Sequence, residues 1–404
     1  MHTLDLLPPR DEPATARVRF TGERGRYTRL MIRGTLLQAI TFGIYRFWLA
    51  TDMRRFLWAN TEIDGDSLDY TGTAIELLLG FLIALAILVP IYVLFAIGGL
   101  ELGIYSQIAG GAGFLALTAF GQYAFYRARR YRLTRTVYRG IRFNQDGSAV
   151  GYVARTIPWA IVTVLTLGLA YPFAQAALER YKMRHTLYGD LRASFAGTGT
   201  SLFLRGLPLW LALFAPLIVT ALVYGIGVDW KPLLVANVHD AIVAASIGWI
   251  VLAAVLLYPV FQGMVWKWWL AGLRFGSISV GTTLRKRQVY GAYLRYALLV
   301  VLASCVAFMI AGAGGAVLFR LAGSHMTDTA AQIGLGLAGI VAYVAFMLVV
   351  WVGYQVVVKL ALWRMVADSV TLDGFASLAT VTPQGEASSA VGEGLADALG
   401  AGGL

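Results

Sequence analysis

Long uncharged stretches dominate this chain of 404 residues. A transmembrane helix needs about 20 apolar residues, because each residue rises about 1.5 Å and the hydrocarbon core is about 30 Å thick. Between consecutive charged residues the sequence holds seven runs of 23 to 30 residues, namely 77–100, 102–126, 156–178, 206–228, 241–266, 296–319 and 329–358. This pattern predicts an all-α polytopic membrane protein.

Positive charge between these runs sets the expected topology. Residues 127–155 carry eight arginines and one acid, Asp146, and residues 267–295 carry six basic residues and no acid. Loops rich in Lys and Arg face the cytoplasm, so an even number of crossings should separate the two segments. Three runs lie between them, and one of the three is therefore expected not to span.

An internal repeat indicates which run this is. Shifting the sequence by 125 residues aligns Thr41 with Thr166 and Gly43 with Gly168. The uncharged segment around the first pair, residues 34–45, has only 12 residues and is too short to cross. If the two copies share a structure, the second segment should not cross either.

The second copy of this segment lies in the run Ile157–Leu178. Pro158 and Pro172 interrupt the same run, and proline disfavours a continuous helix. We therefore expect two re-entrant or interfacial segments. Their candidate motif consists of Thr41, Gly43, Thr166, Gly168 and Pro172.

The resulting fold class has six spanning helices in three hairpins plus the two re-entrant segments, with both termini in the cytoplasm. The hairpins are Leu77–Leu100 with Leu102–Tyr126, Gly206–Val228 with Ala241–Trp266, and Tyr296–Phe319 with Thr329–Val358. Short alternating segments, Ser67–Gly72 and Leu191–Gly197, predict cytoplasmic β-strands. We expect these strands to pair beneath the helices.

The repeat divides the chain into three membrane modules, at residues 17–126, 127–266 and 267–373. An apolar-Arg-Phe triplet recurs at residues 18–20, 141–143 and 273–275, which places the start of a truncated third copy near Gly272. Residues 1–16 and 374–404 are expected to be disordered tails, because they hold too few bulky apolar residues to offset the entropy of ordering them.

Composition excludes several classes of function. With 58% hydrophobic and 14% charged residues, the chain is too apolar for a soluble domain. Its net charge of +11 is explained by cytoplasmic loops rather than by nucleic acid. One cysteine and four scattered histidines offer no metal-ligand spacing. No nucleophile or phosphate-binding motif occurs, and residues 334–339 match the dinucleotide pattern only inside an apolar run. We expect neither an enzyme nor a cofactor.

The arginines that begin the second module are a candidate contact for anionic lipid headgroups. Clustered basic residues beside a helix end attract the acidic lipids of the cytoplasmic leaflet. The same charges can instead act only to fix the topology, without a ligand. The candidate lipid contacts are Arg127, Arg129, Arg130, Arg132 and Arg135.

Two segments carry a resemblance to a known family. The run Tyr131–Phe143, most specifically Tyr138-Arg139-Gly140-Ile141-Arg142-Phe143, and the run Thr166–Pro172 resemble the YjgN-like family of bacterial inner-membrane proteins. The resemblance extends over about residues 18–373. It implies repeated modules and a place in the cell inner membrane. Because the family is a domain of unknown function, it implies no substrate and no catalytic residue.

Two functions remain open from the sequence. The six expected crossings contain no ionisable residue, which disfavours a proton- or ion-coupled pump. Passive or lipid-related transport remains, with the two Thr-x-Gly segments beside a pathway. The alternative is a membrane scaffold or interaction protein that transports nothing.

Overall fold

The computed structural model describes residues 14–101, 106–225, 236–322 and 329–384. In this part of the chain ten antiparallel strands close into a barrel, in which each strand pairs with its neighbours in sequence and β1 also pairs with β10. The strands are β1 (Thr15–Phe20), β2 (Thr61–Ile63), β3 (Asp66–Tyr70), β4 (Thr136–Tyr138), β5 (Ile141–Gln145), β6 (Thr186–Tyr188), β7 (Leu191–Phe195), β8 (Leu273–Phe275), β9 (Ile278–Thr282) and β10 (Val370–Asp373).

Two-residue turns join the strands at one end of the barrel. Asp64, Arg139, Gly189 and Gly276 stand first in these turns, with φ angles of 52°, 46°, 55° and 53°. A positive φ at this position matches the right-handed twist of the paired strands. The fifth strand pair has no turn, because β10 and β1 come from opposite ends of the chain.

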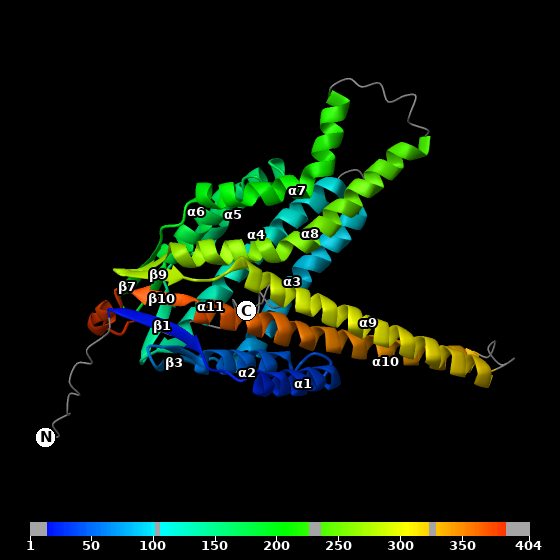
Figure 1. Ribbon diagram of the computed structural model, residues 1–404, viewed down its shortest axis with the longest axis horizontal. Coiled ribbons are helices and arrows are strands. Elements are labelled where there is room, and N and C mark those ends of the chain that lie inside the picture. Colours follow the sequence, from blue (N-terminus) through cyan, green and yellow to red (C-terminus); the bar gives the residue numbers. More distant parts are fainter. Residues whose placement is uncertain (1–13, 102–105, 226–235, 323–328, 385–404) are drawn as a thin grey trace.

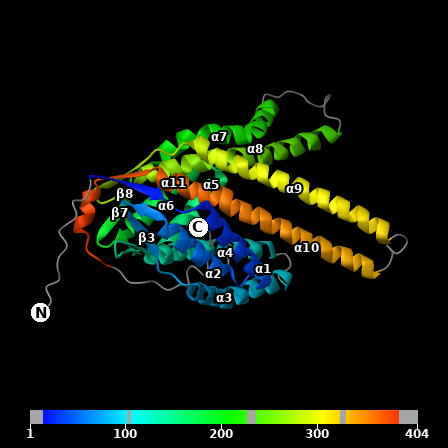
Figure 2. The ribbon, with the colours of Figure 1, turned by 60° about the horizontal axis from the view of Figure 1, so that its bottom comes forward.

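Paired helices connect the strands at the other end of the barrel (Figure 1). The pairs are α1 (Arg24–Ile40) with α2 (Arg46–Ala59), α3 (Ala74–Glu101) with α4 (Ser106–Thr134), α5 (Ala149–Leu165) with α6 (Tyr171–Arg184), α7 (Gly199–Gly225) with α8 (Ala236–Gly272), and α9 (Lys286–Ala322) with α10 (Thr329–Gly353). The last helix continues through the π-helical turn η3 (Tyr354–Lys359) into α11 (Leu360–Asp368). The α7–α8 and α9–α10 pairs extend from the barrel as separate arms (Figures 1 and 2).

The bounds of the elements recur at the 125-residue spacing. The elements α5, α6, β6 and β7 begin and end 125 residues after α1, α2, β2 and β3. Gly72 and Gly197 show why glycine recurs as well: an added Cβ would lie 2.6 Å from the Tyr70 hydroxyl and 2.5 Å from Cζ of Phe195. The ring that ends each strand folds over the glycine two residues later, so no side chain fits there.

Side-chain hydrogen bonds fix where two of the helices, α3 and α5, begin. The Thr73 hydroxyl accepts a hydrogen bond from the Glu76 N–H at 3.3 Å, and the Glu76 carboxylate accepts one from the Thr73 N–H at 3.4 Å. This reciprocal pair is a capping box at the start of α3. The Ser148 hydroxyl caps α5 by accepting from the Gly151 N–H at 3.2 Å. The first residues of these two helices are therefore set by local hydrogen bonds.

The structure corrects the expected all-α class. The expected strands at Ser67–Gly72 and Leu191–Gly197 overlap with β3 and β7, but these belong to a closed ten-stranded barrel that takes strands from all three modules. The other strands escape detection because several have only three residues, which carry too little alternation of apolar and polar positions.

The expected six spanning helices are also wrong. In the described residues four helices are long and apolar enough to cross a membrane: Gly199–Thr220, Ala244–Gly272, Lys286–Gly314 and Gly336–Asp368. These belong to the second and third expected hairpins. In the first, the described apolar part of α3 is Ala74–Pro90, which is shorter than the hydrocarbon core is thick, and residues 102–105 lie outside the described part.

The expected tails overlap with ordered elements. Residues 1–13 lie outside the described part of the chain, whereas Thr15 and Ala16 belong to β1. Residues 385–404 also lie outside it, but Phe375–Thr380 form the 3-10 helix η4. Phe375 is fully buried with Tyr138 and Tyr188, so η4 closes the turn end of the barrel.

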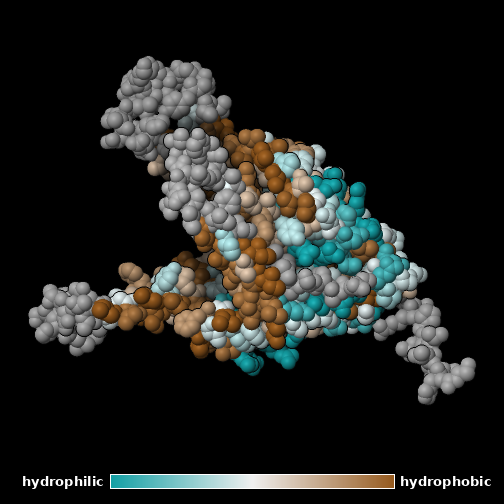
Figure 3. All heavy atoms as spheres, turned by 180° about the vertical axis from the view of Figure 1, so that it is seen from behind, coloured by the Kyte–Doolittle hydropathy of each residue, from teal (hydrophilic) through white to brown (hydrophobic). Residues whose placement is uncertain are grey.

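Apolar side chains cover the outside of the long helices, and hydrophilic residues gather at the barrel end of the molecule (Figure 3). The apolar window of Lys286–Gly314 has no buried residue, and Phe308 is 81% exposed. Exposed apolar surface of this extent is stable in hydrocarbon and not in water. The four helices therefore indicate a membrane protein.

Candidate functional site

The first Thr-x-Gly segment forms the turn between α1 and α2. The Thr41 hydroxyl donates to the Leu37 carbonyl at 2.8 Å and accepts from the Tyr45 N–H at 3.0 Å. Gly43 has a φ of 90°, and its N–H donates to the Gln38 carbonyl at 2.8 Å. The hydroxyl thus links the end of one helix to the start of the next, and glycine supplies the left-handed backbone.

The second Thr-x-Gly segment repeats this geometry between α5 and α6. The Thr166 hydroxyl donates to the Val162 carbonyl at 2.8 Å and accepts from the Ala170 N–H at 3.1 Å. Gly168 has a φ of 89° and donates to the Thr163 carbonyl at 2.7 Å. The run Ile157–Leu178 is therefore split into two helices at this turn.

The prolines play a different part from the one expected. Pro158 lies inside α5, and Pro172 stands in the first turn of α6. Proline is tolerated in a first turn, because the N–H that it lacks has no partner within the helix there. The chain reverses at Gly168, and Pro172 starts the helix that follows.

The two turns differ in their surroundings. At the first turn Phe42 is 98% exposed and Ile40 is 72% exposed. At the second, the indole N–H of Trp210 on α7 donates to the Leu167 carbonyl at 2.8 Å, which holds the turn against the neighbouring helix pair. Both turns present apolar side chains, and at the second the Trp210 bond comes from a candidate spanning helix.

A cavity of about 280 Å³ lies between the second turn and helices α7 and α8. Its wall is almost entirely apolar, so it suits a hydrocarbon group rather than a charged ligand. The candidate residues Gly168 and Pro172 line it, whereas Thr41, Gly43 and Thr166 do not. Other lining residues are Phe203, Gly206, Trp210 and Phe261.

The candidate lipid-binding arginines lie at the end of α4 and just beyond it, and two of them have well-defined protein partners. Arg129 donates to the side chains of Gln145 at 2.5 Å and Thr186 at 3.0 Å. Burial lowers the pKa of its guanidinium. Arg135 forms an ion pair with Glu76 at 2.7 Å. Arg127, Arg130 and Arg132 are half-buried, and their contact with lipid stays a prediction.

A buried ion pair near Arg129 was not foreseen from the sequence. Glu179 on α6 is 7% exposed and pairs with Lys182 at 2.5 Å. The Trp269 indole N–H from α8 donates to the other oxygen of the same carboxylate at 3.0 Å. Burial lowers the pKa of Lys182. A Glu and a Lys three residues apart usually lie on a solvated helix face, so no local pattern marks this pair as buried.

Metal binding finds no support in the part of the chain that the structure describes, where no group of three or more His, Cys, Asp or Glu residues could hold an ion. The candidate site is the apolar cavity, because two of the predicted motif residues, Gly168 and Pro172, line it. Its chemistry is that of enclosing an apolar group.

Comparison with known proteins places the chain in a family. A family described as a bacterial protein of unknown function, DUF898, matches residues 15–236 and 234–380. No curated protein and no solved structure matches. DUF898 is the YjgN family, so the resemblance carried by residues 138–143 and 166–172 is confirmed. Since the match covers most of the chain, this protein belongs to the bacterial DUF898 family of unknown function.

Proposed function

We propose that this protein is a multi-pass protein of the bacterial inner membrane that holds the acyl chain of a lipid in the cavity beside Gly168, as part of passive or lipid-related transport. The observation that carries the proposal is the position of this cavity. Its walls at Phe203, Gly206 and Phe261 belong to the candidate spans Gly199–Thr220 and Ala244–Gly272. An acyl chain can therefore enter from the bilayer without meeting water.

The lining explains the chemical class of this ligand. The Trp210 N–H is already bonded to the Leu167 carbonyl, and the Tyr258 hydroxyl accepts from the Gln262 amide at 2.5 Å. Each methylene that moves into such an apolar environment from water contributes about 0.8 kcal/mol. From bilayer hydrocarbon the gain comes instead from closer packing, which a flat helix surface does not offer.

Filling the cavity tests the proposal. Gly206 lies in α7 and lines the cavity, and an added Cβ would meet only Cε of Met264, at an ordinary 3.5 Å. Gly206→Leu should therefore fold, because leucine also favours a helix more than glycine does. We expect at least about tenfold less photo-cross-linking of a phospholipid with a diazirine in its acyl chain, because leucine occupies the space of two or three methylenes and their packing contacts with the cavity wall are lost.

The control is Gly312→Leu, at a helical glycine with no atom within 4 Å of an added Cβ. It makes the same change on α9, away from the cavity, and should leave the cross-linking unchanged. Lipid exchange between the leaflets of proteoliposomes should fall in Gly206→Leu only. Unchanged cross-linking in a folded Gly206→Leu protein would exclude the cavity as the acyl site.

The orientation that we propose places the barrel and both termini in the cytoplasm. Basic residues lie close to the barrel at the start of α9, where Arg285 just before the helix and Lys286 and Arg287 within it are exposed, and positive charge favours the cytoplasmic side. In a Cys305→Ser background, a cysteine replacing the exposed Ser277 in the β8–β9 turn should react with an impermeant maleimide only in inverted vesicles. Labelling in intact spheroplasts would show that the barrel lies on the opposite side of the membrane and would contradict this orientation.

A scaffold without transport is the second candidate, and the α9–α10 arm favours it. Its apolar residues Leu298, Phe308 and Val341 are each more than half exposed, which leaves the arm free to contact a protein neighbour as well as lipid. If the protein is a scaffold, Gly206→Leu would leave its complex with the protein neighbour intact, whereas apolar-to-polar changes on α9 would disrupt that complex.

A further inference from the structure

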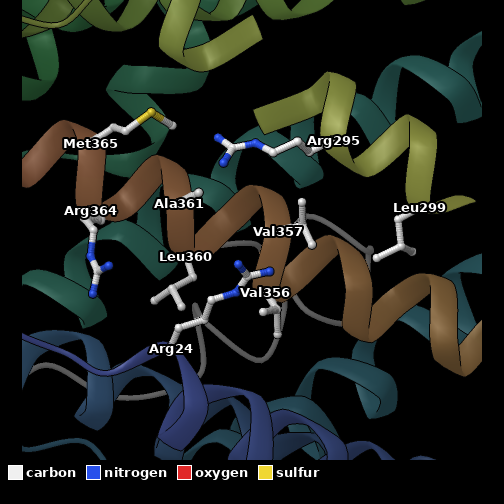
Figure 4. Close-up of a pocket in the computed structure, with 9 residues that line it drawn as sticks. All are labelled: Arg24, Arg295, Leu299, Val356, Val357, Leu360, Ala361, Arg364 and Met365. Atoms are coloured by element: carbon white, nitrogen blue, oxygen red, sulfur yellow. The ribbon is translucent and has the colours of Figure 1, made fainter. Parts of the chain in front are cut away.

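A second cavity, of about 410 Å³, lies where the start of α1 meets α9 and the η3–α11 segment (Figure 4). Three arginines from these distant parts of the chain line it: Arg24, Arg295 and Arg364. No acidic residue is among the lining residues. The cavity is therefore strongly basic, and an anion is the ligand that its charge favours.

The three guanidinium groups are held to different degrees. Arg364 donates to the Gly22 carbonyl at 2.5 Å, and its guanidinium lies 5.5 Å from the centre of the Phe20 ring. Arg295 uses its Nε to reach the Gly291 carbonyl of its own helix at 3.0 Å, which leaves its two terminal nitrogens for a ligand. Arg24 is exposed at the first position of α1, where the helix dipole adds positive potential.

The remaining wall of this cavity is apolar. Leu299 of α9 and Val356 of η3 lie on it, and both fall within candidate spans, Lys286–Gly314 and Gly336–Asp368. Figure 4 shows Arg295 extending from α9 beside α11, while Arg24 reaches from α1 toward Val356 and Leu360. The site thus places cationic groups next to lipid-facing hydrocarbon.

We infer that this cavity binds the phosphate group of an anionic phospholipid, with Arg24 and Arg295 on the phosphate oxygens and an acyl chain along Leu299 and Val356. Arginine binds phosphate through paired N–H groups, and the apolar wall accepts the chain that a free phosphate lacks. This inference is independent of the acyl cavity beside Gly168, because the two cavities share no lining residue.

The site also differs from the arginines that the sequence singles out. The guanidinium group of Arg129 donates to Gln145 and Thr186, and that of Arg135 forms an ion pair with Glu76. Arg24 and Arg295 instead face an open cavity. Arg24 and Arg295 are exposed, no acidic residue lines their cavity, and its wall is apolar. They therefore suit a lipid phosphate better than Arg129 and Arg135 do.

The test is the double variant Arg24→Gln with Arg295→Gln, which leaves Arg364 on the Gly22 carbonyl. The full-length protein is released from nanodiscs of equal phosphatidylglycerol and phosphatidylcholine, and retained lipid is counted by native mass spectrometry. The wild type should retain phosphatidylglycerol preferentially. The double variant should lose this preference at least about tenfold, because charge-assisted hydrogen bonds from two guanidinium groups are removed.

The matched control is Arg33→Gln with Arg287→Gln. These arginines lie on the same two helices and are exposed, but they do not line the cavity. The control should keep the preference, and an equal loss in both double variants would reduce the site to general surface charge and overturn the inference. Inorganic phosphate is added in a second arm. Competition by millimolar phosphate that fully removes bound lipid would identify a free-phosphate site instead, and weak competition supports the lipid.

Discussion

Replacing Glu179 by leucine is expected to lower the free energy of unfolding by about 3–5 kcal/mol, because it removes one partner of a buried ion pair. Glu179 and Lys182 have side chains that are only 9% and 12% exposed. Without the carboxylate, Lys182 and the nearby Arg129 would be buried together with no negative charge between them. Chemical unfolding in detergent micelles, followed by the loss of helical circular dichroism, measures the effect.

Two further variants separate charge from packing. Glu23→Leu changes an exposed acid that makes no capping bond at the start of α1, and should alter stability by less than about 0.5 kcal/mol. Adding Lys182→Met to Glu179→Leu should recover part of the loss, since a buried pair can be replaced by apolar side chains with little cost. If the double variant is less stable than the single one, the explanation by an unpaired buried cation is wrong.

The helices of this fold could be predicted from the sequence far better than its barrel could. Uncharged runs mark the apolar helices directly, and the 125-residue repeat reproduces the bounds of α1 and α2 in α5 and α6. The strands β2 and β3 recur as β6 and β7 at the same spacing, but a strand of three residues carries too little alternation of apolar and polar positions to be recognised as a strand. The dipeptide Asp64-Gly65 is a known hairpin signal, and recognising it would have located β2 and β3.

Charge density along the sequence was a poor guide to charge on the surface. Arg129 near the end of α4 and Arg135 just after it point to different neighbours, Arg129 toward β5 and β6 and Arg135 toward Glu76 on α3. The basic cavity instead combines Arg24 with Arg295 and Arg364, which come from opposite ends of the chain. Barrel closure brings β1 beside β10, and α1 packs against α10 and η3, so only the closed topology places these arginines together.

The same limit applies to the acyl cavity. Its turn could be predicted, because Gly168 belongs to the repeated Thr-x-Gly pattern. Its walls could not, because Phe203, Trp210 and Phe261 look like ordinary residues of apolar helices. The 125-residue repeat also gives no warning of the buried Glu179, since Arg54 occupies the corresponding place in the first copy.

Phe375→Ala is the second substitution with a large expected effect, a loss of about 3–5 kcal/mol in the free energy of unfolding. Phe375 is fully buried at the turn end of the barrel, and the Arg139 guanidinium lies 5.4 Å from the centre of its ring. The segment around it is anchored on both sides. The Gly374 N–H donates to the Ala14 carbonyl at 2.9 Å, and the Thr382 N–H donates to the Asp190 carboxylate at 3.1 Å.

These anchors explain why the loss should be close to the full cost of a cavity. They keep η4 in place, so the barrel cannot collapse into the space that alanine leaves beside the apolar cavity of about 220 Å³ in the barrel interior. Phe42→Ala is the control, because it removes the same side-chain atoms at a position that is 98% exposed. Its unfolding in detergent should match that of the wild type.

Binding of a small apolar ligand distinguishes a cavity left by the Phe375 ring from a general loss of stability. An enlarged dry cavity lined by Tyr138, Tyr188 and Phe275 should take up benzene, and binding to the folded state alone raises stability by mass action. Benzene should therefore stabilise Phe375→Ala more than it stabilises the wild type or Phe42→Ala. If Phe375→Ala unfolds at the same denaturant concentration as Phe42→Ala, η4 does not close the barrel, and the chain after β10 contributes nothing to the core.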